Sequence, residues 1–177
     1  METDAGLEAW IIAVSPGAIA YARSLTGHAD DAEDLVHDVI CRLISHREYN
    51  LPRDGERLLF RSITNACINR RMRAREVESL DAERGEGLRL LDTVASDDEA
   101  DPADVAMTHE LSAAIERELR ELPQLQRAAV ELKSTGKPLK EIAEVLGLTP
   151  VNAGVLICRG RKQLARRLAP YLPENAR

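Results

Sequence analysis

Apolar residues recur at helical spacing in the first part of the chain. In "DDAEDLVHDVICRLISH", residues 30–46, the apolar positions follow one another at three- and four-residue steps and form one stripe. A polar break with Pro52 and Gly55 follows, and helical spacing returns in "RLLFRSITNACINRRMRAR", residues 57–75. The pattern predicts two amphipathic helices with one apolar face each.

Four more helical segments are expected after residue 110, and each has its own start or stop signal. "ELSAAIERELRELP" must end before Pro123, which in turn opens "QLQRAAVELKST", with Gly136 just past its end. "PLKEIAEVLGL" ends in a turn at Gly147. Thr149 is placed to cap a last helix that has Pro150 in its first position.

The segment between these two groups is acidic. From residue 76 to 110 there are twelve Asp or Glu and two Arg, with Gly85, Gly87 and Pro102 and little periodicity, which is typical of a linker. The sequence therefore predicts an all-α protein with two small helical domains, 1–76 and 111–177. An acidic flexible linker, 77–110, joins them, and the second is a four-helix domain with a helix-turn-helix. Whether the domains pack together stays open.

Composition and charge narrow the function classes. The formal net charge is −6, but residues 61–75 hold five arginines and no acid, and residues 151–177 hold six Lys or Arg and one Glu. Two basic blocks of this kind favour nucleic-acid binding. There is no apolar run of membrane-spanning length, and the acidic N-terminus is unlike a signal peptide, so we expect a cytoplasmic protein without membrane insertion.

The segment "KEIAEVLGLTPVNAGVLICRGR", residues 140–161, has the features of a DNA-reading helix-turn-helix. Ala143 supplies the small residue of its first helix and Gly147 the turn. The apolar residues expected to lock the two helices together are Ile142, Leu146, Leu148, Val151 and Val155. A plain hairpin in a helical bundle is the alternative. The basic residues that follow the turn suit a phosphate backbone and favour DNA: Arg159, Arg161, Lys162, Arg166 and Arg167.

Other candidate chemistry is sparse. The three cysteines are far apart, and His37 with Cys41 supplies only two potential ligands, so no metal site is expected. Asp34 and Asp38 lie one turn apart without a nucleophile or a phosphate loop, which leaves a solvated face or a protein-docking face. We predict no catalytic site, no cofactor and no enzyme activity.

Taken together, these motifs resemble bacterial sigma factors of the extracytoplasmic-function (ECF) group. "ADDAEDLVHDVICRLI" is similar to the core-polymerase-binding helix of that family, and "LLFRSITNACINRRMRAR" to the segment that follows it. "LPQLQRAAVELKSTGKPLKEIAEVLGLTPVNAGVLICRGRKQLARRL" is similar to the second domain. The resemblance implies promoter-specific transcription initiation with core RNA polymerase and promoter DNA as partners, and an anti-sigma factor as a regulator.

The resemblance also implies roles for individual residues. Those on the polymerase-binding helix are Asp34, Leu35, His37, Asp38 and Val39. Those at the −10 element and its melted strand are Arg61, Asn65, Asn69, Arg70, Arg71 and Arg73. Those at the −35 element are Thr149, Val151, Asn152, Arg159, Arg161 and Lys162.

The sequence departs from the family pattern at several positions. His37 replaces a frequent Gln, and Leu58 replaces a frequent aromatic residue. Gly154 and Leu156 stand where Lys and Arg are common, so we expect phosphate contacts and DNA shape to contribute more to recognition of the −35 element. A conventional helix-turn-helix regulator acting without polymerase, and an interaction protein that does not bind DNA, remain alternatives.

Overall fold

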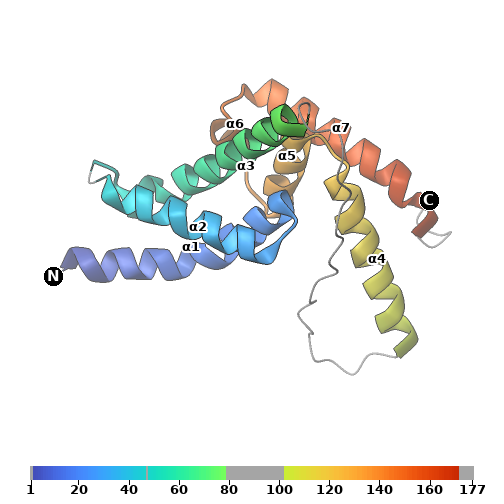
Figure 1. The fold of residues 1–177 in the computed structure, drawn as a ribbon, viewed down its shortest axis with the longest axis horizontal. Coiled ribbons are helices and arrows are strands. Elements are labelled where there is room, and N and C mark those ends of the chain that lie inside the picture. Colours follow the sequence, from blue (N-terminus) through green and yellow to red (C-terminus); the bar gives the residue numbers. More distant parts are fainter. Residues whose placement is uncertain (1, 47, 79–101, 172–177) are drawn as a thin grey trace.

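The protein is described here by a computed structural model that covers residues 2–46, 48–78 and 102–171. Seven α-helices make up most of this part of the chain, and Figure 1 shows their order. They are α1 (Glu2–Thr26), α2 (Ala29–Ser45), α3 (Glu56–Glu78), α4 (Pro102–Arg120), α5 (Gln124–Ser134), α6 (Leu139–Leu146) and α7 (Pro150–Leu168). A π-helical turn, Leu51–Gly55, precedes α3, and a 3₁₀ turn, Ala169–Tyr171, follows α7.

The helices α1, α2 and α3 pack on one another and form the N-terminal half. The apolar stripe of α2 is buried as its spacing predicts, with Ala32, Val36 and Leu43 facing the core. Trp10 on α1 lies so close to the π-helical turn that a Cβ at Gly55 would stand 2.6 Å from the indole ring, so glycine is required there. Trp10 thus packs against the turn that leads into α3.

The helices α4 to α7 form the C-terminal half, in which α7 packs against α4, α5 and α6. The local signals in the sequence account for its turns. Gly136 and Gly147 both have positive φ, 83° and 66°, which glycine adopts without strain. Thr149 caps α7, and its side-chain oxygen accepts from the backbone N–H of Asn152.

The two halves pack together, which answers the question that the sequence left open. Their buried side chains form one continuous cluster, with α3 against α6 and α1 against α5. Arg127 of α5 is only 3% exposed, and its Nη1 donates to the backbone oxygen of Leu25 at the end of α1, at 3.0 Å. Its Nε donates to the oxygen of Leu119, at 2.7 Å. The same buried cation therefore ties three helices.

A second polar contact joins α3 to the start of α6. Lys137 Nζ lies 2.6 Å from Glu56 Oε1 and 2.7 Å from Glu141 Oε1, and 4.8 Å from the centre of the Phe60 ring. Burial lowers the pKa of Lys137, but hydrogen bonds to Glu141 and Glu56 outweigh that effect and raise the pKa overall. Lys137 therefore stays charged at neutral pH and can form ion pairs with both carboxylates.

Two elements differ from the sequence prediction. Helix α1 was not expected; Pro16 and Gly17 interrupt its pattern, yet both lie inside the helix. Helix α4 begins at Pro102, within the segment predicted as linker, while residues 79–101 of that segment lie outside the described residues. Among the described helices, none alone is long and apolar enough to cross a bilayer; α6 and α7 meet that criterion only as a pair bent by 98°.

Candidate functional site

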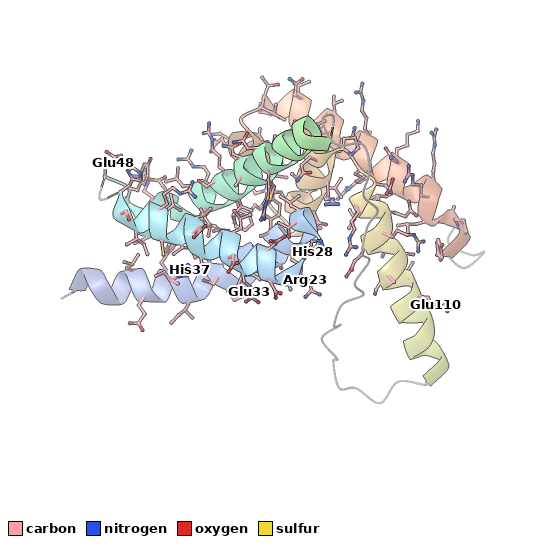
Figure 2. The ribbon with its side chains drawn as sticks, in the orientation of Figure 1. Arg23, His28, Glu33, His37, Glu48 and Glu110 are labelled. Carbon is pink, nitrogen blue, oxygen red and sulfur yellow. The ribbon has the colours of Figure 1, made fainter. Side chains whose placement is uncertain are left out.

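The exposed side of α2 is acidic. Asp34 and Asp38 are exposed one turn apart, and Glu33 and His37 lie beside them on the same exposed side of the helix (Figure 2). The opposite side of α2 is the buried apolar stripe, so the core holds the helix and leaves the carboxylates in solvent. Such a face can pair with a basic partner surface.

Not every residue predicted on this surface is available to a partner. Val39 is 1% exposed and belongs to the core, and Leu35 is half-buried against it. The reason is visible in the spacing, because Val39 follows Leu35 and Val36 in the apolar stripe. Of the five predicted residues, Asp34, His37 and Asp38 are therefore exposed to a partner, and Val39 packs behind them.

The exposed side of α3 carries amides and arginines. Arg61, Asn65 and Asn69 are exposed at intervals of one turn, and Arg70 adjoins them. Arg70 Nη2 lies 3.3 Å from Asp31 Oδ1 on α2, an exposed ion pair that links the two helices. Arg71 and Arg73 lie on α3, but their side chains are outside the described part of the structure.

The buried side of α3 is fixed by a chain of hydroxyl groups. Thr64 Oγ1 donates to the backbone oxygen of Phe60 at 2.7 Å, and the Tyr21 hydroxyl lies 2.7 Å from the same Oγ1. Because the threonine proton is already used, Tyr21 is the donor in the second bond. Burial raises the pKa of Tyr21 and raises the pKa of Cys67 to about 11, so both groups stay neutral behind the exposed face.

The first turns of α7 present uncharged side chains. Val151 is 74% exposed, Asn152 is exposed, and Val155 is 41% exposed. Thr149 is exposed as well, although its oxygen is engaged as the helix cap. The opposite face, with Ala153, Ile157, Gly160 and Leu164, is buried against the other helices of this half.

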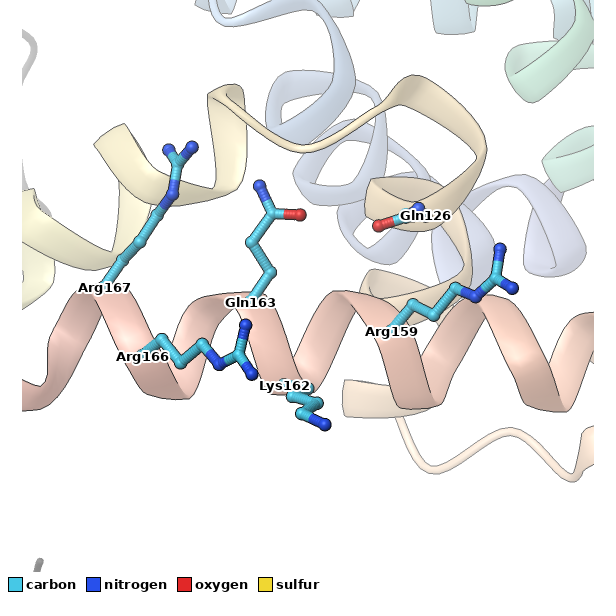
Figure 3. A pocket seen from close by; sticks show the side chains of 6 residues that line it. All are labelled: Gln126, Arg159, Lys162, Gln163, Arg166 and Arg167. Carbon is cyan, nitrogen blue, oxygen red and sulfur yellow. The ribbon is translucent and has the colours of Figure 1, made fainter.

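The later turns of α7 are basic. Arg159, Arg161 and Lys162 are exposed. A groove between α7 and α5 is lined by Gln126, Arg159, Lys162, Gln163, Arg166 and Arg167. Figure 3 shows that the cationic side chains spread to both sides of the helix. Arg167 is engaged by Glu118 of α4 at 3.1 Å, so it also fixes α4 against α7. The lysine and arginines that line the groove give it a positive charge, which attracts phosphate groups.

Sequence reasoning missed the residues between the halves. Arg127 and Lys137 were not singled out, because their partners in the other half, the Leu25 backbone oxygen and the Glu56 carboxylate, lie 102 and 81 residues away in the sequence. The described residues contain no group of three or more potential metal ligands. His37 and Cys41 do approach each other, with Nε2 and Sγ 3.7 Å apart, and both are exposed.

Family models match both halves of the chain. Residues 10–77 match sigma-70 region 2, and residues 112–164 match sigma-70 region 4. The ECF RNA polymerase sigma factor SigW of Bacillus subtilis (strain 168) is 28% identical over 148 residues, which cover 81% of this chain and 79% of that protein.

A solved structure has the same fold. The sigma factor RpoE from Bartonella quintana, in its complex with the anti-sigma factor NepR, superposes with a TM-score of 0.71 at 22% identity. The match covers 92% of this chain and 96% of RpoE. Since both sigma regions are matched in the expected order and on the helices that carry the exposed acidic, amide and basic side chains, the chain belongs to the sigma-70 family, as a sigma factor of the ECF group.

Proposed function

We propose that this sigma factor, which directs RNA polymerase to specific promoters, divides its work among α2, α3 and α7. The observation that carries the proposal is the sorting of exposed chemistry by helix. Acids face solvent on α2, amides and arginines on α3, and an uncharged start with a basic continuation on α7. We assign residues 1–76 to polymerase and −10 contacts and residues 111–177 to the −35 element, with 77–110 between them.

Docking on core polymerase is assigned to α2. Asp34 and Asp38 supply two exposed carboxylates on one face, and His37 lies between them along the chain. A basic surface of the polymerase is the partner that such a face would attract and orient. Val39 and Leu35 support this function from the core side, where they hold the backbone of α2 in place.

Contact with the −10 element is assigned to α3. Asn65 and Asn69 present amides that can hydrogen bond with base edges. Arg61 and Arg70 are exposed on the same helix, where they can contact neighbouring phosphates. We include Arg71 and Arg73 from the sequence pattern. Phe60 is only 4% exposed, so its ring is not available to stack on an unpaired base.

Contact with the −35 element is assigned to α7. Asn152 is the exposed amide of its first turns, and Thr149 and Val151 flank it. Arg159, Arg161 and Lys162 supply phosphate contacts farther along the helix. In this assignment, these residues take over the DNA contacts that the family often makes with Lys and Arg at the positions of Gly154 and Leu156.

Promoter binding requires the two halves to separate. Elements named −10 and −35 lie roughly 25 base pairs apart, which is about 85 Å at 3.4 Å per pair. In the packed arrangement α3 contacts α6 directly, and α6 contacts α7. A 19-residue helix such as α7 is only about 28 Å long. The polymerase would therefore have to open the contacts made by Arg127 and Lys137.

Regulation and location complete the proposal. RpoE is named with an anti-sigma factor, and we propose a partner of that kind here, together with a cytoplasmic location beside the polymerase. Sigma factors in general are not enzymes, and we extend that to this chain.

The test is binding of full-length protein to core polymerase. We expect the double change Asp34→Asn, Asp38→Asn to weaken binding about tenfold or more, at about 1 kcal/mol for each charge pair lost. Glu8→Gln, an exposed acid on α1, is the matched control and should bind normally. Equal affinity of the double variant and the control would contradict the role of α2.

A further inference from the structure

The first two turns of α7 have an apolar surface that packing does not explain. Val151 and Val155 stand one turn apart on the same side of the helix, 74% and 41% exposed. The buried face of α7 lies elsewhere, at Ala153 and Ile157. Valine also has a lower helix propensity than most residues, so neither side chain is there to strengthen the helix.

The apolar surface extends onto α6. Leu139 is 39% exposed, and a Cβ at Gly154 would lie 3.8 Å from Leu139 Cδ2, in ordinary contact. A longer side chain at 154 would therefore cover Leu139, and glycine leaves it open. Leu139, Val151 and Val155 are three of the eight large hydrophobic residues that are exposed in the described residues. Their gathering on one hairpin points to a ligand.

The charge of the surrounding surface indicates which ligand. The same helix continues into Arg159, Arg161 and Lys162, and the groove beside it is lined by further arginines. An apolar helix start followed by a basic helix end matches duplex DNA, which presents phosphates outside and base edges within the major groove. A protein partner with an apolar helix would not need the cations.

The major groove offers one apolar group, the C5-methyl of thymine. We propose that Val151 and Val155 read thymine methyl groups in the −35 element, and that Asn152 between them hydrogen bonds with an adjacent base. The proposal rests on the assignment of α7 to that element and names the feature that it recognises. It also explains how α7 achieves specificity without cations at Gly154 and Leu156: methyl contacts require a small, uncharged surface.

The test uses full-length protein with core polymerase on a promoter mapped by run-off transcription. Each thymine of the upstream element, on either strand, is replaced by deoxyuridine, which removes only the methyl group. We expect an affinity loss of about fourfold at one or two positions, the value of one buried methyl. The same replacement in the spacer should have no effect.

The protein variants identify the side chains. Val151→Ala or Val155→Ala should make thymine and uracil equal at the position that each one reads. Ile12→Ala removes an exposed apolar side chain from α1 and should retain full discrimination. Circular dichroism confirms folding, which alanine on a helix surface should not impair.

Several results would overturn the proposal. Equal binding of thymine and uracil at every position of the element would do so, as would an element without an A·T pair. If Val151→Ala lowers transcription but leaves the difference between thymine and uracil unchanged, then the apolar surface contacts a protein partner and not thymine. If the upstream sequence can be replaced without effect, or no promoter is found, then the assignment of α7 itself fails, and this inference fails with it.

Discussion

Helices α3 and α7 are both proposed to contact DNA, yet they distribute their polar side chains differently. On α3 the exposed amides Asn65 and Asn69 stand between arginines, so cations and base-edge groups are mixed along one face. On α7 they are separated: the helix start is uncharged and apolar, and the cations begin at Arg159. Mixed groups suit a strand whose bases and phosphates are both accessible, whereas separated groups suit a duplex entered from one end.

The buried sides of the two helices differ as well. A polar chain, from Tyr21 through Thr64 to the backbone of Phe60, fixes α3. Close packing fixes α7, since a Cβ at Gly160 would stand 2.7 Å from Val130 Cγ2 on α5. Apolar packing therefore holds both helices from behind, and on α3 the two hydrogen bonds of Thr64 add to the packing of Leu59 and Ile63.

The largest expected effect is on the exposed face of α3. Asn65→Ala with Asn69→Ala should lower transcription about 100-fold, at 1–3 kcal/mol for each amide–base contact. The loss should be specific to melted DNA. Wild-type holoenzyme should bind a template with a premelted −10 region more tightly than a duplex, and the variant should lose that preference.

Arg159→Ala on α7 is the control for this comparison. It should weaken binding to the premelted and the duplex template by the same factor, because the upstream duplex is present in both. A variant of α3 that retains the preference for premelted DNA would remove the distinction between the two helices.

The next effect is on the buried face of α7. Gly160→Leu forces a side chain into the contact with Val130 and should lower the free energy of unfolding by about 2–3 kcal/mol. Gly17→Leu is the matched control, because a Cβ at that position of α1 meets nothing within 4 Å. Urea denaturation of both variants measures the difference, and equal stability would show that α7 is not closely packed on α5.

A smaller effect is expected behind α3. Thr64→Val should lower the free energy of unfolding by about 1–2 kcal/mol, because the buried Tyr21 hydroxyl loses its acceptor. Adding Tyr21→Phe removes the unpaired hydroxyl and should recover part of the loss. If the double variant is less stable than Thr64→Val alone, then the hydroxyl chain does not hold α3 in the way described.

The smallest effect concerns the basic turns of α7. Arg159→Gln with Lys162→Gln should weaken binding to all promoter sequences alike, and should reduce the slope of log affinity against log salt by about 2. Arg53→Gln, an exposed cation before α3, is the control. A change in sequence preference instead of salt dependence would make these residues base readers.

The sequence predicts the two halves unequally. The turns after residue 122 have strong local signals, and Pro123, Gly136, Gly147 and Thr149 all serve as expected. Helix α1 escaped notice because Pro16 and Gly17 mask an apolar repeat that includes Trp10, Tyr21 and Leu25. Local sequence signals thus predict the start of α7 well, but they do not predict α1, which packs behind α3.

The sequence also predicts only part of which residues are exposed and which are buried. Periodicity separates the exposed Asp34 and Asp38 from the core, and applied strictly it also places Val39 inside. Packing of the two halves could not be foreseen, because Arg127 bonds with a backbone oxygen 102 residues away, which no side-chain pattern encodes. The expectation that Val151 and Val155 lock the two helices of the hairpin was wrong, because Ala153 and Ile157 form the buried face of α7 and leave both valines exposed.

Run-off transcription tests the central claim most directly. The purified protein is added to core RNA polymerase with genomic DNA fragments from its source organism, and the transcript starts are mapped. We expect discrete starts that share two upstream motifs. Recognition of one motif should be lost with Asn65→Ala and Asn69→Ala, and recognition of the other with changes at Val151 and Asn152. Absence of discrete starts, with no binding to core polymerase, would contradict the claim.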